Sequence, residues 1–507
     1  MSHFPLDSQI HNNLYSAKTV REIDQAAIKK MNNGAIKLMN RAGTAAFEEL
    51  IEAFGQPSLI TVFCGSGNNA GDGYILAGRA AQRLIPVQVV ELGNAKNFSE
   101  QTQQAREYAE QNKVKFCALT DSLALDQGII VDSLLGTGAN GSLKDAYAQA
   151  VDQINQSGLP VLAMDIATGL NADTGAVSDR AVKADITVTF VGAKAGLFTG
   201  RGPSISGEVI YHSLDIADEI YEEFTPQAQL MDVYDLLEML PQFDGDEYKN
   251  QRGHCMIIGG DHGYGGAASL AAEASLKVGS GLTSVATQPE HISAILARCP
   301  EIMACGVTSG QQLEPLLEKP SVLVVGPGLG RSPWSEQLLQ KAVATGLPMV
   351  LDADALNILA DGRVVRQDKA QRWVLTPHMG EAARLLGVSV EDIQADRFAA
   401  VLKIQEKYNA VVLLKGPGTL ISSQDQSFKL CPYGNPAMAT AGMGDILSGI
   451  IGGLLAQGLD RQQATELGCC LHSAAADELV STSGYRGVTA TDILPWVKKL
   501  LNQDFAE

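Results

Sequence analysis

The 507-residue sequence lacks several features that mark secreted, membrane-bound or nucleic-acid-binding proteins. Residues 1–13 are polar and carry no apolar core followed by a small-residue cleavage site, so we expect no secretory signal. No stretch approaches the roughly 18 uninterrupted apolar residues that a membrane-spanning helix needs. Basic residues are outnumbered, 38 Lys and Arg against 57 Asp and Glu. The net charge of −19 disfavours binding to nucleic acid and to anionic membranes.

Aromatic residues make up only 6 % of the chain, and the eight cysteines lack the spacing of a metal site or a redox motif. No C-x-x-C pair occurs, and Cys64 ends an apolar, strand-like run. We therefore expect reduced thiols in apolar surroundings and a cytoplasmic protein. The sequence also contains no G-x-x-x-x-G-K-[ST] motif, which excludes nucleotide binding by a P-loop.

Glycine is abundant, with 51 residues, and short apolar runs alternate with amphipathic stretches. This alternation is typical of βαβ units around a parallel sheet. The length predicts two to four domains, and an acidic stretch over residues 220–250 separates two glycine-rich halves. We predict an α/β protein of two domains, residues 1–225 and 226–507, with a linker near 225–250 and a Rossmann-like parallel sheet in the first domain.

The apolar runs predict strands, and the amphipathic stretches predict helices between them. In the first half we expect strands at 58–64, 86–92, 129–135, 160–165, 185–191 and 208–212, and helices at 17–31, 35–54, 74–84 and 99–112. In the second half we expect strands at 254–258, 321–325, 348–351, 373–375 and 411–414, and helices at 267–278, 334–344, 380–386, 390–408 and 444–456. The pattern also allows a short helix within 230–240 that belongs to the second domain.

Polar residues follow four of the predicted strands of the first half. The loop at 65–73 combines glycines with Asp72, and Asp132 lies within an apolar strand that leads into the G-x-G-x-x-G sequence of 136–141. Asp165 and Lys194 follow the next strands. A strand-to-helix turn or a helix-capping aspartate explains each feature separately. Since parallel strands end at one edge, the four together indicate a crevice in which side chains exchange protons with a ligand.

The strongest pattern of the second half is the run of small residues 437–449, which ends in Gly442-Met443-Gly444-Asp445 before an apolar helix. Free N–H groups at such a helix start favour phosphate charge, with Asp445 beside them as a base. A glycine-rich helix cap without ligand has a similar pattern. The neighbouring motifs favour the binding function; they are 326–330, 351–357, 376–381 and 415–419.

The segments 68–73, 132–138, 165–170 and 194–197 occur in the order of the NAD(P)H-hydrate epimerase domain, which the chain resembles over residues 20–214. The family usually has glycine where Ala70 stands, Pro-Ser where Ala167-Thr168 stand, and proline where Ala195 stands. The resemblance implies a potassium ion held by Asn69, Asp132 and Thr168, and proton handling by Asp165 and Lys194. It implies binding of a hydrated nicotinamide nucleotide by Asn68, Asn69, Ala70, Gly71, Asp72, Gly136, Thr137, Gly138, Ala139, Asn140, Gly141, Ser142 and Asp165.

The motifs of the second half resemble the ribokinase-like superfamily, and more closely its ADP-dependent NAD(P)H-hydrate dehydratase domain, over residues 248–496. The resemblance implies a ribokinase-like α/β fold with Asp445 as a catalytic residue. Glu381 would act on Mg²⁺, directly or through water. The hydrated substrate would be bound by Ala267, Gly330, His378 and Asp445, and the adenine nucleotide by Lys415, Gly416, Pro417, Gly418, Thr419 and Gly444.

Together the two resemblances imply a bifunctional repair enzyme for damaged nicotinamide cofactor. The first domain would interconvert the R and S hydrates of NADH and NADPH. The second would use Mg²⁺ and ADP to phosphorylate the ring hydroxyl of the S hydrate, and elimination would restore the double bond. Expected partners are these small molecules and further copies of the chain, with no nucleic acid or membrane. The alternative is a kinase for a thiazole or pyrimidine alcohol, joined to a non-catalytic nucleotide-binding module.

Overall fold

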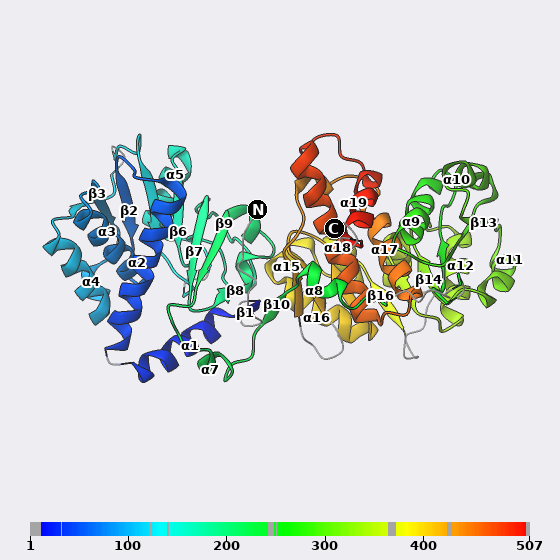
Figure 1. Cartoon of the computed structure of the whole chain (residues 1–507), viewed down its shortest axis with the longest axis horizontal. Helices are drawn as coiled ribbons and strands as arrows, with labels where there is room; N and C mark the ends of the chain where they lie inside the picture. Colours follow the sequence, from blue (N-terminus) through cyan, green and yellow to red (C-terminus); the bar gives the residue numbers. More distant parts are fainter. Residues whose placement is uncertain are drawn as a thin grey trace. The chain divides into compact units, whose positions relative to one another are not determined.

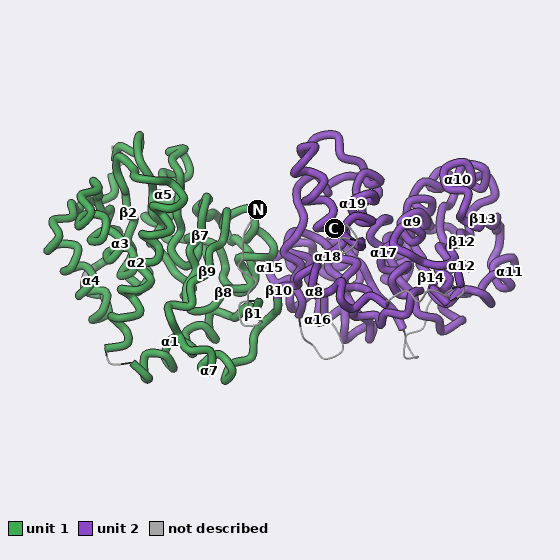
Figure 2. Tube along the Cα trace, in the orientation of Figure 1, with its two compact units in different colours: residues 1–229 green, residues 230–507 purple. Residues whose placement is uncertain are grey.

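The computed structural model describes residues 12–31, 33–120, 123–138, 141–241, 248–249, 251–362, 372–422 and 428–502. The chain divides into two compact units, residues 1–229 and residues 230–507 (Figure 2). Part of the predicted linker, residues 242–247 and 250, lies outside the described residues, and the assignment of one activity to each side of it stays a prediction. Within the described segments, no helix is both long and apolar enough to cross a membrane.

A parallel sheet with strand order β4-β3-β2-β5-β6-β7-β9 forms the centre of the first unit (Figure 1). Its central strands are buried on both faces, which explains their continuous apolar runs. All six predicted strands occur, and β4 is an addition. Five of the six are shorter than predicted, by one residue at each end or by two residues at one end. The bounds are β2 Ile60–Cys64, β3 Val87–Glu91, β4 Lys115–Cys117, β5 Ile129–Ser133, β6 Val161–Met164, β7 Ile186–Phe190 and β9 Glu208–His212.

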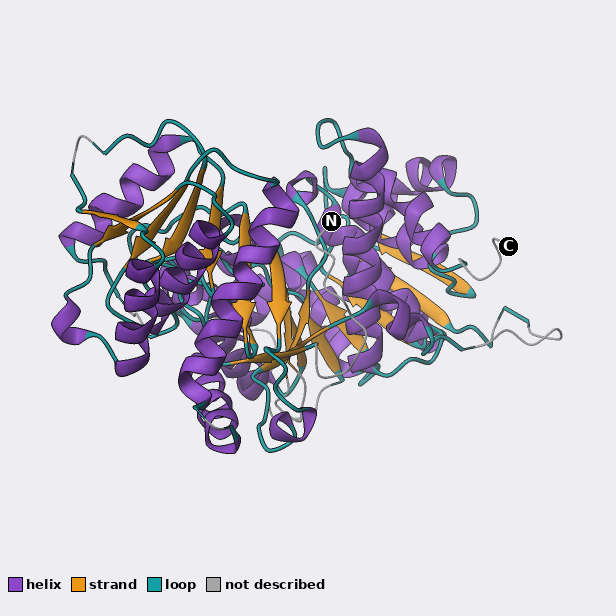
Figure 3. Ribbon diagram, turned by 60° about the vertical axis from the view of Figure 1, so that its left-hand side comes forward, coloured by secondary structure: helices purple, strands orange, loops and turns teal. Residues whose placement is uncertain are grey.

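Helices cover both faces of this sheet (Figure 3). One face packs against α1 Ala17–Lys30, α2 Gly34–Phe54, α3 Asn68–Gln82 and α4 Glu100–Gln111, and the other against α5 Asp145–Ser157. A small ribbon pairs β1 antiparallel with β10 and parallel with β8. The remaining bounds are β1 Asn13–Tyr15, β8 Ala193–Lys194, β10 Ala228–Leu230, α6 Gly202–Ile205, α7 Asp218–Tyr221, and the 3-10 turns η1 Ala95–Asn97 and η2 Ala195–Leu197.

The prediction of a loop up to Gly73 was wrong, because α3 already begins at Asn68. Glycine disfavours a helix interior, yet here it allows close packing. A Cβ on Gly71 would lie 2.4 Å from Met39 Cε, and one on Gly73 would lie 2.5 Å from Ser133 Oγ. The glycines therefore let α3 approach α2 and β5, and they place Asn68 and Asp72 in the first turns of a helix.

The second unit has its own sheet, with strand order β13-β12-β11-β14-β15-β16-β17-β18-β19. Its neighbours are parallel from β13 to β17, and β18 and β19 are antiparallel additions. The sequence did not predict β12, β13, β18 or β19. The bounds are β11 His254–Ile258, β12 Leu282–Thr287, β13 Met303–Gly306, β14 Val322–Val325, β15 Met349–Leu351, β16 Trp373–Leu375, β17 Val411–Leu414, β18 Thr419–Ser422 and β19 Phe428–Cys431.

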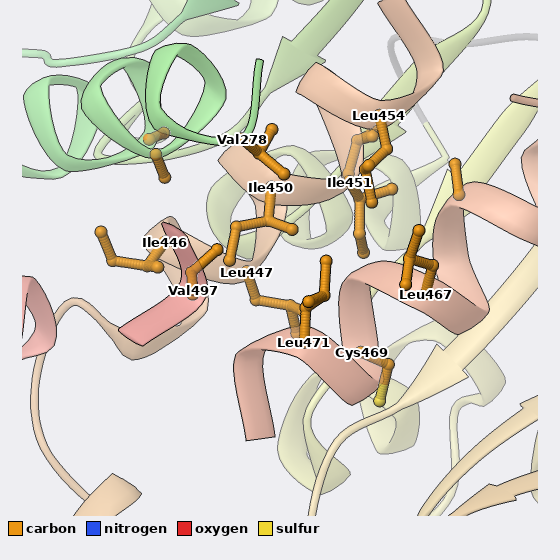
Figure 4. Close-up of a cluster of buried hydrophobic side chains, with 14 of the residues drawn as sticks. Val278, Ile446, Leu447, Ile450, Ile451, Leu454, Leu467, Cys469, Leu471 and Val497 are labelled. Carbon is orange, nitrogen blue, oxygen red and sulfur yellow. The ribbon is translucent and has the colours of Figure 1, made fainter. Parts of the chain in front are cut away.

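The helix α17, Met443–Ala456, is buried on nearly all sides between α9, α18 and the sheet, and its side chains form the centre of the hydrophobic cluster in Figure 4. Its small residues are required by this packing. A Cβ on Gly449 would lie 2.1 Å from Ala271 O, and one on Gly452 would lie 2.3 Å from Val324 Cγ2. The Gly-rich composition thus brings the helix N-terminus, with Asp445, close to the sheet.

The predicted helices of the second unit all occur, with one correction, whereas α10, α11, α13, α18 and α19 were not predicted. The expected single helix over 390–408 divides at Asp396, which has an extended backbone and caps the following helix by accepting a hydrogen bond from Ala399 N. The bounds are α8 Val233–Leu237, α9 Gly265–Lys277, α10 Ile292–Arg298, α11 Gly310–Leu313, α12 Pro333–Ala344, α13 Ala353–Asp361, α14 Met379–Leu386, α15 Val390–Ala395, α16 Arg397–Tyr408, α18 Arg461–Ser483 and α19 Leu494–Leu500, with 3-10 turns η3 Pro289–His291, η4 Glu314–Glu318, η5 Pro436–Met438 and η6 Ala490–Ile493.

Both sheets reverse their strand order at one point, between β2 and β5 in the first unit and between β11 and β14 in the second. Ligands of open α/β sheets bind outside the carboxyl ends of the strands at such a point. Each unit therefore has one position where its topology favours a binding site.

Candidate active sites

A cavity of about 450 Å³ lies at the reversal point of the first unit. Of the predicted substrate-binding residues, the cavity is lined by Asn68, Asn69, Asp72, Gly136, Thr137, Gly138 and Asp165. Ala70 is fully buried within α3, and Gly71 packs against Met39, so neither lines it. Gly141 and Ser142 are not among the lining residues, and Ala139 and Asn140 lie outside the described part of the chain.

Lys194 and Asp165 form an ion pair beside this cavity. The Lys194 side chain is fully buried, and its Nζ also donates to Thr189 Oγ1 over 3.0 Å and to Phe190 O over 2.9 Å. Asp165 remains 18 % exposed and lines the cavity. A ligand in the cavity can therefore contact the Asp165 carboxylate, whereas the Lys194 ammonium is buried and held in a fixed position.

Each strand that leads to this pair ends in a strained turn. After β6, the amide N of Ile166 donates to Met164 O over 2.7 Å, and Asp165 between them has a φ of +65°. After β7, the corresponding 2.7 Å bond spans Val191, whose φ is +66°. A bond of this span around a positive φ is the pattern of a classic γ-turn, which is rare and costs free energy. Such strain persists where the surrounding structure imposes it, commonly at functional sites.

Two tyrosines hold the second of these turns. The hydroxyls of Tyr211 and Tyr221 both donate to the Val191 carbonyl, over 2.9 and 2.6 Å. A β-branched residue at positive φ is an outlier, so the turn depends on contacts of this kind. The tyrosines thereby fix the segment that leads to Lys194.

Two more carboxyl groups line the cavity, Asp72 from α3 and Asp24 from α1. Burial, and then the negative charge of Asp165, raise the pKa of both carboxyls, that of Asp72 strongly. Asp24 was not among the predicted site residues. The sequence did contain a signal, because Asp24 lies between Val20 and Ile28 at the four-residue spacing of one helix face, and all three line the cavity.

The predicted potassium ligands Asn69, Asp132 and Thr168 are brought together at the cavity: Asn69 lines it, Asn69 and Thr168 both bond to Leu135, and Thr168 bonds to Asp132. The fully buried Asp132 accepts hydrogen bonds from Thr168 N (2.7 Å) and Thr168 Oγ1 (2.8 Å). Burial raises the pKa of Asp132 to about 6. Asn69 Nδ2 donates to Leu135 O over 3.3 Å, whereas Asn69 Oδ1 is buried without a partner among the described residues. An unpaired buried oxygen needs a donor or a cation.

In the second unit, Lys415 at the end of β17 is the centre of the candidate site. Its Nζ lies 2.7 Å from Asp352 Oδ1 and 3.9 Å from Glu381 Oε2, and a Cβ on Gly444 would lie 3.4 Å from it. Burial lowers the pKa of Lys415, but Asp352 and Glu381 outweigh this effect and raise it. Asp352, for which no role was predicted, also accepts from Ser448 Oγ over 2.6 Å. It therefore fixes Lys415 against the start of α17.

Asp445 and Glu381 face the same lysine from different helices. Burial and the charge of Asp352 raise the pKa of Asp445 to about 7, and burial raises the pKa of Glu381 to about 7. Both of these carboxyl groups therefore change protonation near neutral pH.

His378 and Glu381 cap the start of α14 together. His378 N donates to Glu381 Oε2 over 2.8 Å, and His378 Nδ1 accepts from Gly380 N over 2.9 Å. Burial, followed by the charge of Lys415, lowers the pKa of His378. The neutral ring therefore carries its proton on Nε2, and 54 % of the side chain is exposed to a ligand.

The loops at the reversal point of the second unit carry the other predicted substrate residues. A Cβ on Gly328 would lie 3.1 Å from the Cβ of Ala267, in the first turn of α9, and Gly260 N donates to Pro327 O over 3.0 Å, so the loops after β14 and β11 are adjacent. Gly330 N donates to Asp354 Oδ2 over 3.0 Å, and Asn357 Nδ2 donates to Asp354 Oδ1 over 3.2 Å. No role was predicted for Asp354 or Asn357 from the sequence. In the structure, Asp354 positions Gly330, and Asn357 positions Asp354.

Arg397 supports the predicted nucleotide loop of residues 415–419 from below. The side chain is fully buried and donates to Pro417 O over 2.5 Å and to Leu414 O over 3.2 Å. Burial lowers its pKa to about 10. No motif distinguishes this arginine in the sequence, because its role arises from contacts with a loop about 20 residues away.

The amino-acid sequence matches two family models. Residues 35–196 match the YjeF-related protein N-terminus, and residues 255–499 match NAD(P)H-hydrate dehydratase.

Similar proteins cover almost the whole chain. The bifunctional NAD(P)H-hydrate repair enzyme Nnr of Coxiella burnetii is 43 % identical over 96 % of this chain and 99 % of its own. The enzyme of the same name from Escherichia coli K12 is 36 % identical over 98 % of this chain and 96 % of its own. Among solved structures, a ribokinase-like superfamily protein from Enterococcus faecalis superposes with a TM-score of 0.51 at 30 % identity, covering 55 % of this chain and 97 % of the other.

Proposed function

Because this chain belongs to the family of bifunctional NAD(P)H-hydrate repair enzymes, we propose that its two units carry out the two steps of that repair. The first unit epimerises the R and S hydrates of NADH and NADPH. The second removes water from the S hydrate at the expense of ADP. The observation that carries the proposal is that each unit gathers ionisable side chains at the carboxyl ends of its parallel strands, within the span that its family model matches.

In the first unit, Asn68, Asp72 and the loop at 136–138 bind the nucleotide, and Asp165 contacts the altered ring. The buried Lys194 holds the Asp165 carboxyl group in place through their ion pair. Asp165 lines the cavity and is the candidate acceptor of a proton from water or from the ring hydroxyl.

Potassium fits the first unit. Asn69 Oδ1 is buried without a partner in the described part of the chain, and the buried Asp132 has no basic side chain among its hydrogen-bond partners. Carboxylate, amide and hydroxyl oxygens replace the hydration shell of such an ion. When bound, the ion supplies positive charge next to the nucleotide loop. Asn69, Asp132 and Thr168 would hold it.

We expect epimerisation to depend on potassium. Removing K⁺ in favour of a large organic cation should lower the epimerase rate, and Thr168→Val should raise the K⁺ concentration needed for half-maximal rate by about tenfold, the effect of losing one ligand contact worth about 1.4 kcal/mol. Steady-state rates over a K⁺ titration measure both effects. Dehydration by the same protein is the control; an epimerase rate independent of K⁺ would remove the ion from the proposal.

In the second unit, Asp445 removes the proton from the ring hydroxyl as that oxygen attacks the terminal phosphoryl group of ADP. The free N–H groups at the start of α17 and the Lys415 ammonium stabilise the charge that develops on the phosphoryl oxygens. The loop at 415–419, held by Arg397, binds the nucleotide. Phosphate then leaves more readily than hydroxide, and elimination restores the double bond.

The second unit can accommodate Mg²⁺ if Glu381 binds the ion through one of its water molecules. Glu381 has both oxygens engaged within the chain, Oε2 with His378 N and Oε1 at 3.3 Å from His378 Nε2. Mg²⁺ commonly keeps several waters and takes few protein ligands besides substrate phosphates, so Glu381 suits a bound water of the ion. When bound, Mg²⁺ neutralises charge on the phosphates.

The dehydratase rate should rise with pH through about 7. Burial raises the pKa of Asp445 to about 7, so the base is protonated and inactive below this value and active above it. We expect kcat/KM for the S hydrate to fall about tenfold for each pH unit below the pKa. A profile that is flat from pH 5.5 to 8 would argue against Asp445 as the base.

The proposed function is tested with purified protein and a mixture of both epimers of hydrated NADH. The return of reduced-nicotinamide absorbance is followed with Mg²⁺ and ADP, ATP or no nucleotide. Recovery of both epimers supports both activities, and recovery of the S portion alone, beyond its spontaneous equilibration, reduces the first unit to a binding module. A stable phosphorylated alcohol without recovery would favour the kinase alternative.

A further inference from the structure

We propose that Asp24 is a further catalytic residue of the epimerase site, which donates a proton to the hydroxyl group that leaves the nicotinamide ring. The inference rests on the proposed function of the first unit. It assigns a role to α1, a helix outside the motifs that carry the family resemblance.

The placement of Asp24 supports a contact with the substrate. Asp24 lies one helical turn from Val20 and from Ile28 on α1, and all three residues line the cavity. Asp165, which follows β6, lines the same cavity. The substrate ring therefore meets carboxyl groups from two different elements.

The charges around the cavity are unequal. Asp24, Asp72 and Asp165 provide three carboxyl groups, whereas the cations are Lys194 and Arg21. Lys194 pairs with Asp165, and within the described residues no ion pair joins either cation to Asp24 or Asp72. Arg21 is exposed, and a Cβ on Gly138 would lie 3.8 Å from its Nη1, which places the guanidinium near the nucleotide loop.

Partly buried carboxyl groups without a cation retain their protons more readily. Burial and the charge of Asp165 raise the pKa of Asp24, in agreement with this expectation. Asp165 pairs with Lys194, whereas Asp24 has no ion pair among the described residues, so we assign Asp24 as the acid and Asp165 as the proton acceptor. Two carboxyl groups held in different protonation states in one site are the usual arrangement of an acid and a base.

Epimerisation needs both an acid and a base. A dihydronicotinamide ring is an enamine, so water adds its hydroxyl to the carbon next to the ring nitrogen. Asp24 protonates this hydroxyl, the C–O bond breaks, and the nitrogen lone pair forms an iminium ion with release of water. Water then adds to the other face of the ring and gives its proton to Asp165. Proton exchange with solvent returns Asp24 and Asp165 to their starting states. One C–O bond breaks, one forms, and nothing is oxidised or reduced.

Asp24→Asn tests this role. We expect the epimerase kcat to fall by about 10²- to 10⁴-fold, the usual contribution of a general acid, with KM changed less than about twofold. Asp24→Glu should restore part of the rate, and formate should partly rescue Asp24→Ala. Glu22→Gln is the matched control, because Glu22 is exposed on the same helix and pairs only with Lys18 among the described residues.

The outcomes separate the inference from the proposed function. Unchanged epimerisation by Asp24→Asn, or a rise in KM alone, overturns the role of Asp24 while the epimerase stands. If the Asn variant loses both rate and folding of the first unit, the formate test on Asp24→Ala decides, and absence of rescue overturns the inference. If the unaltered protein does not epimerise the hydrates, the proposed function itself fails.

Discussion

Replacing Asp445 by Asn is expected to lower the dehydratase kcat by about 10²- to 10⁴-fold, the range typical for loss of a general base. Asn has the same size and leaves the start of α17 intact, but it cannot accept the proton of the ring hydroxyl. The carboxylate lies in the field of Lys415 and Asp352, and burial raises its pKa to about 7, where proton transfer at neutral pH is most effective. Recovery of NADH absorbance from the S hydrate measures the loss.

The epimerase of the same chain serves as an internal control for Asp445→Asn, since it should keep its full rate. Asp235→Asn, an exposed aspartate of the second unit, should behave like the unaltered protein. Nucleotide affinity, measured separately by calorimetry, should change little. A variant with weakened nucleotide binding but normal kcat would place Asp445 in binding and not in proton transfer.

Replacing Asp165 by Asn should lower the epimerase kcat to a similar degree, because the carboxylate that accepts the proton is lost. The same change leaves Lys194 fully buried without its counter-ion, so the first unit should also become less stable. Rates of R-to-S conversion and the midpoint of thermal unfolding record the two effects.

A second variant separates these effects. Asp165→Asn combined with Lys194→Met removes the unpaired charge and should recover stability without recovering the rate. Asp126→Asn, at an exposed position of the same unit, should change neither quantity. If the double variant regains epimerisation, the ion pair is structural, and the proton acceptor must be sought elsewhere.

Most of the sheet and the strand-end residues follow from local sequence. Continuous apolar runs predicted the buried parallel strands, since such strands are covered on both faces. Asp165, Lys194 and Asp445 were found because polar residues directly follow or interrupt those runs. The start of α3 was missed because the packing of Gly71 and Gly73 against other elements outweighs their low helix propensity.

The residues that sequence reasoning missed act through long-range contacts. Asp352 reaches Lys415, which is 63 positions later, and Arg397 reaches a loop about 20 positions later. Asp24 shares one helix face with Val20 and Ile28, but the sequence does not show that this face lines a cavity instead of packing in a core. The pattern of residues along one sequence does not show these contacts, because the contacts depend on which loops the folded sheet brings together.

The two γ-turns set a limit on how stable the first unit can become. Each residue held in such a conformation costs about 1–3 kcal/mol, a sizeable part of the 5–15 kcal/mol by which domains are commonly stable. Glycine at position 191 would relieve this cost, because it adopts positive φ without a steric penalty. It would also free the segment that carries Lys194. A residue at position 191 therefore cannot serve both the stability of the first unit and the alignment of Lys194. Selection for thermal stability alone would favour glycine at this position, whereas selection for epimerisation would favour a residue that keeps the segment fixed.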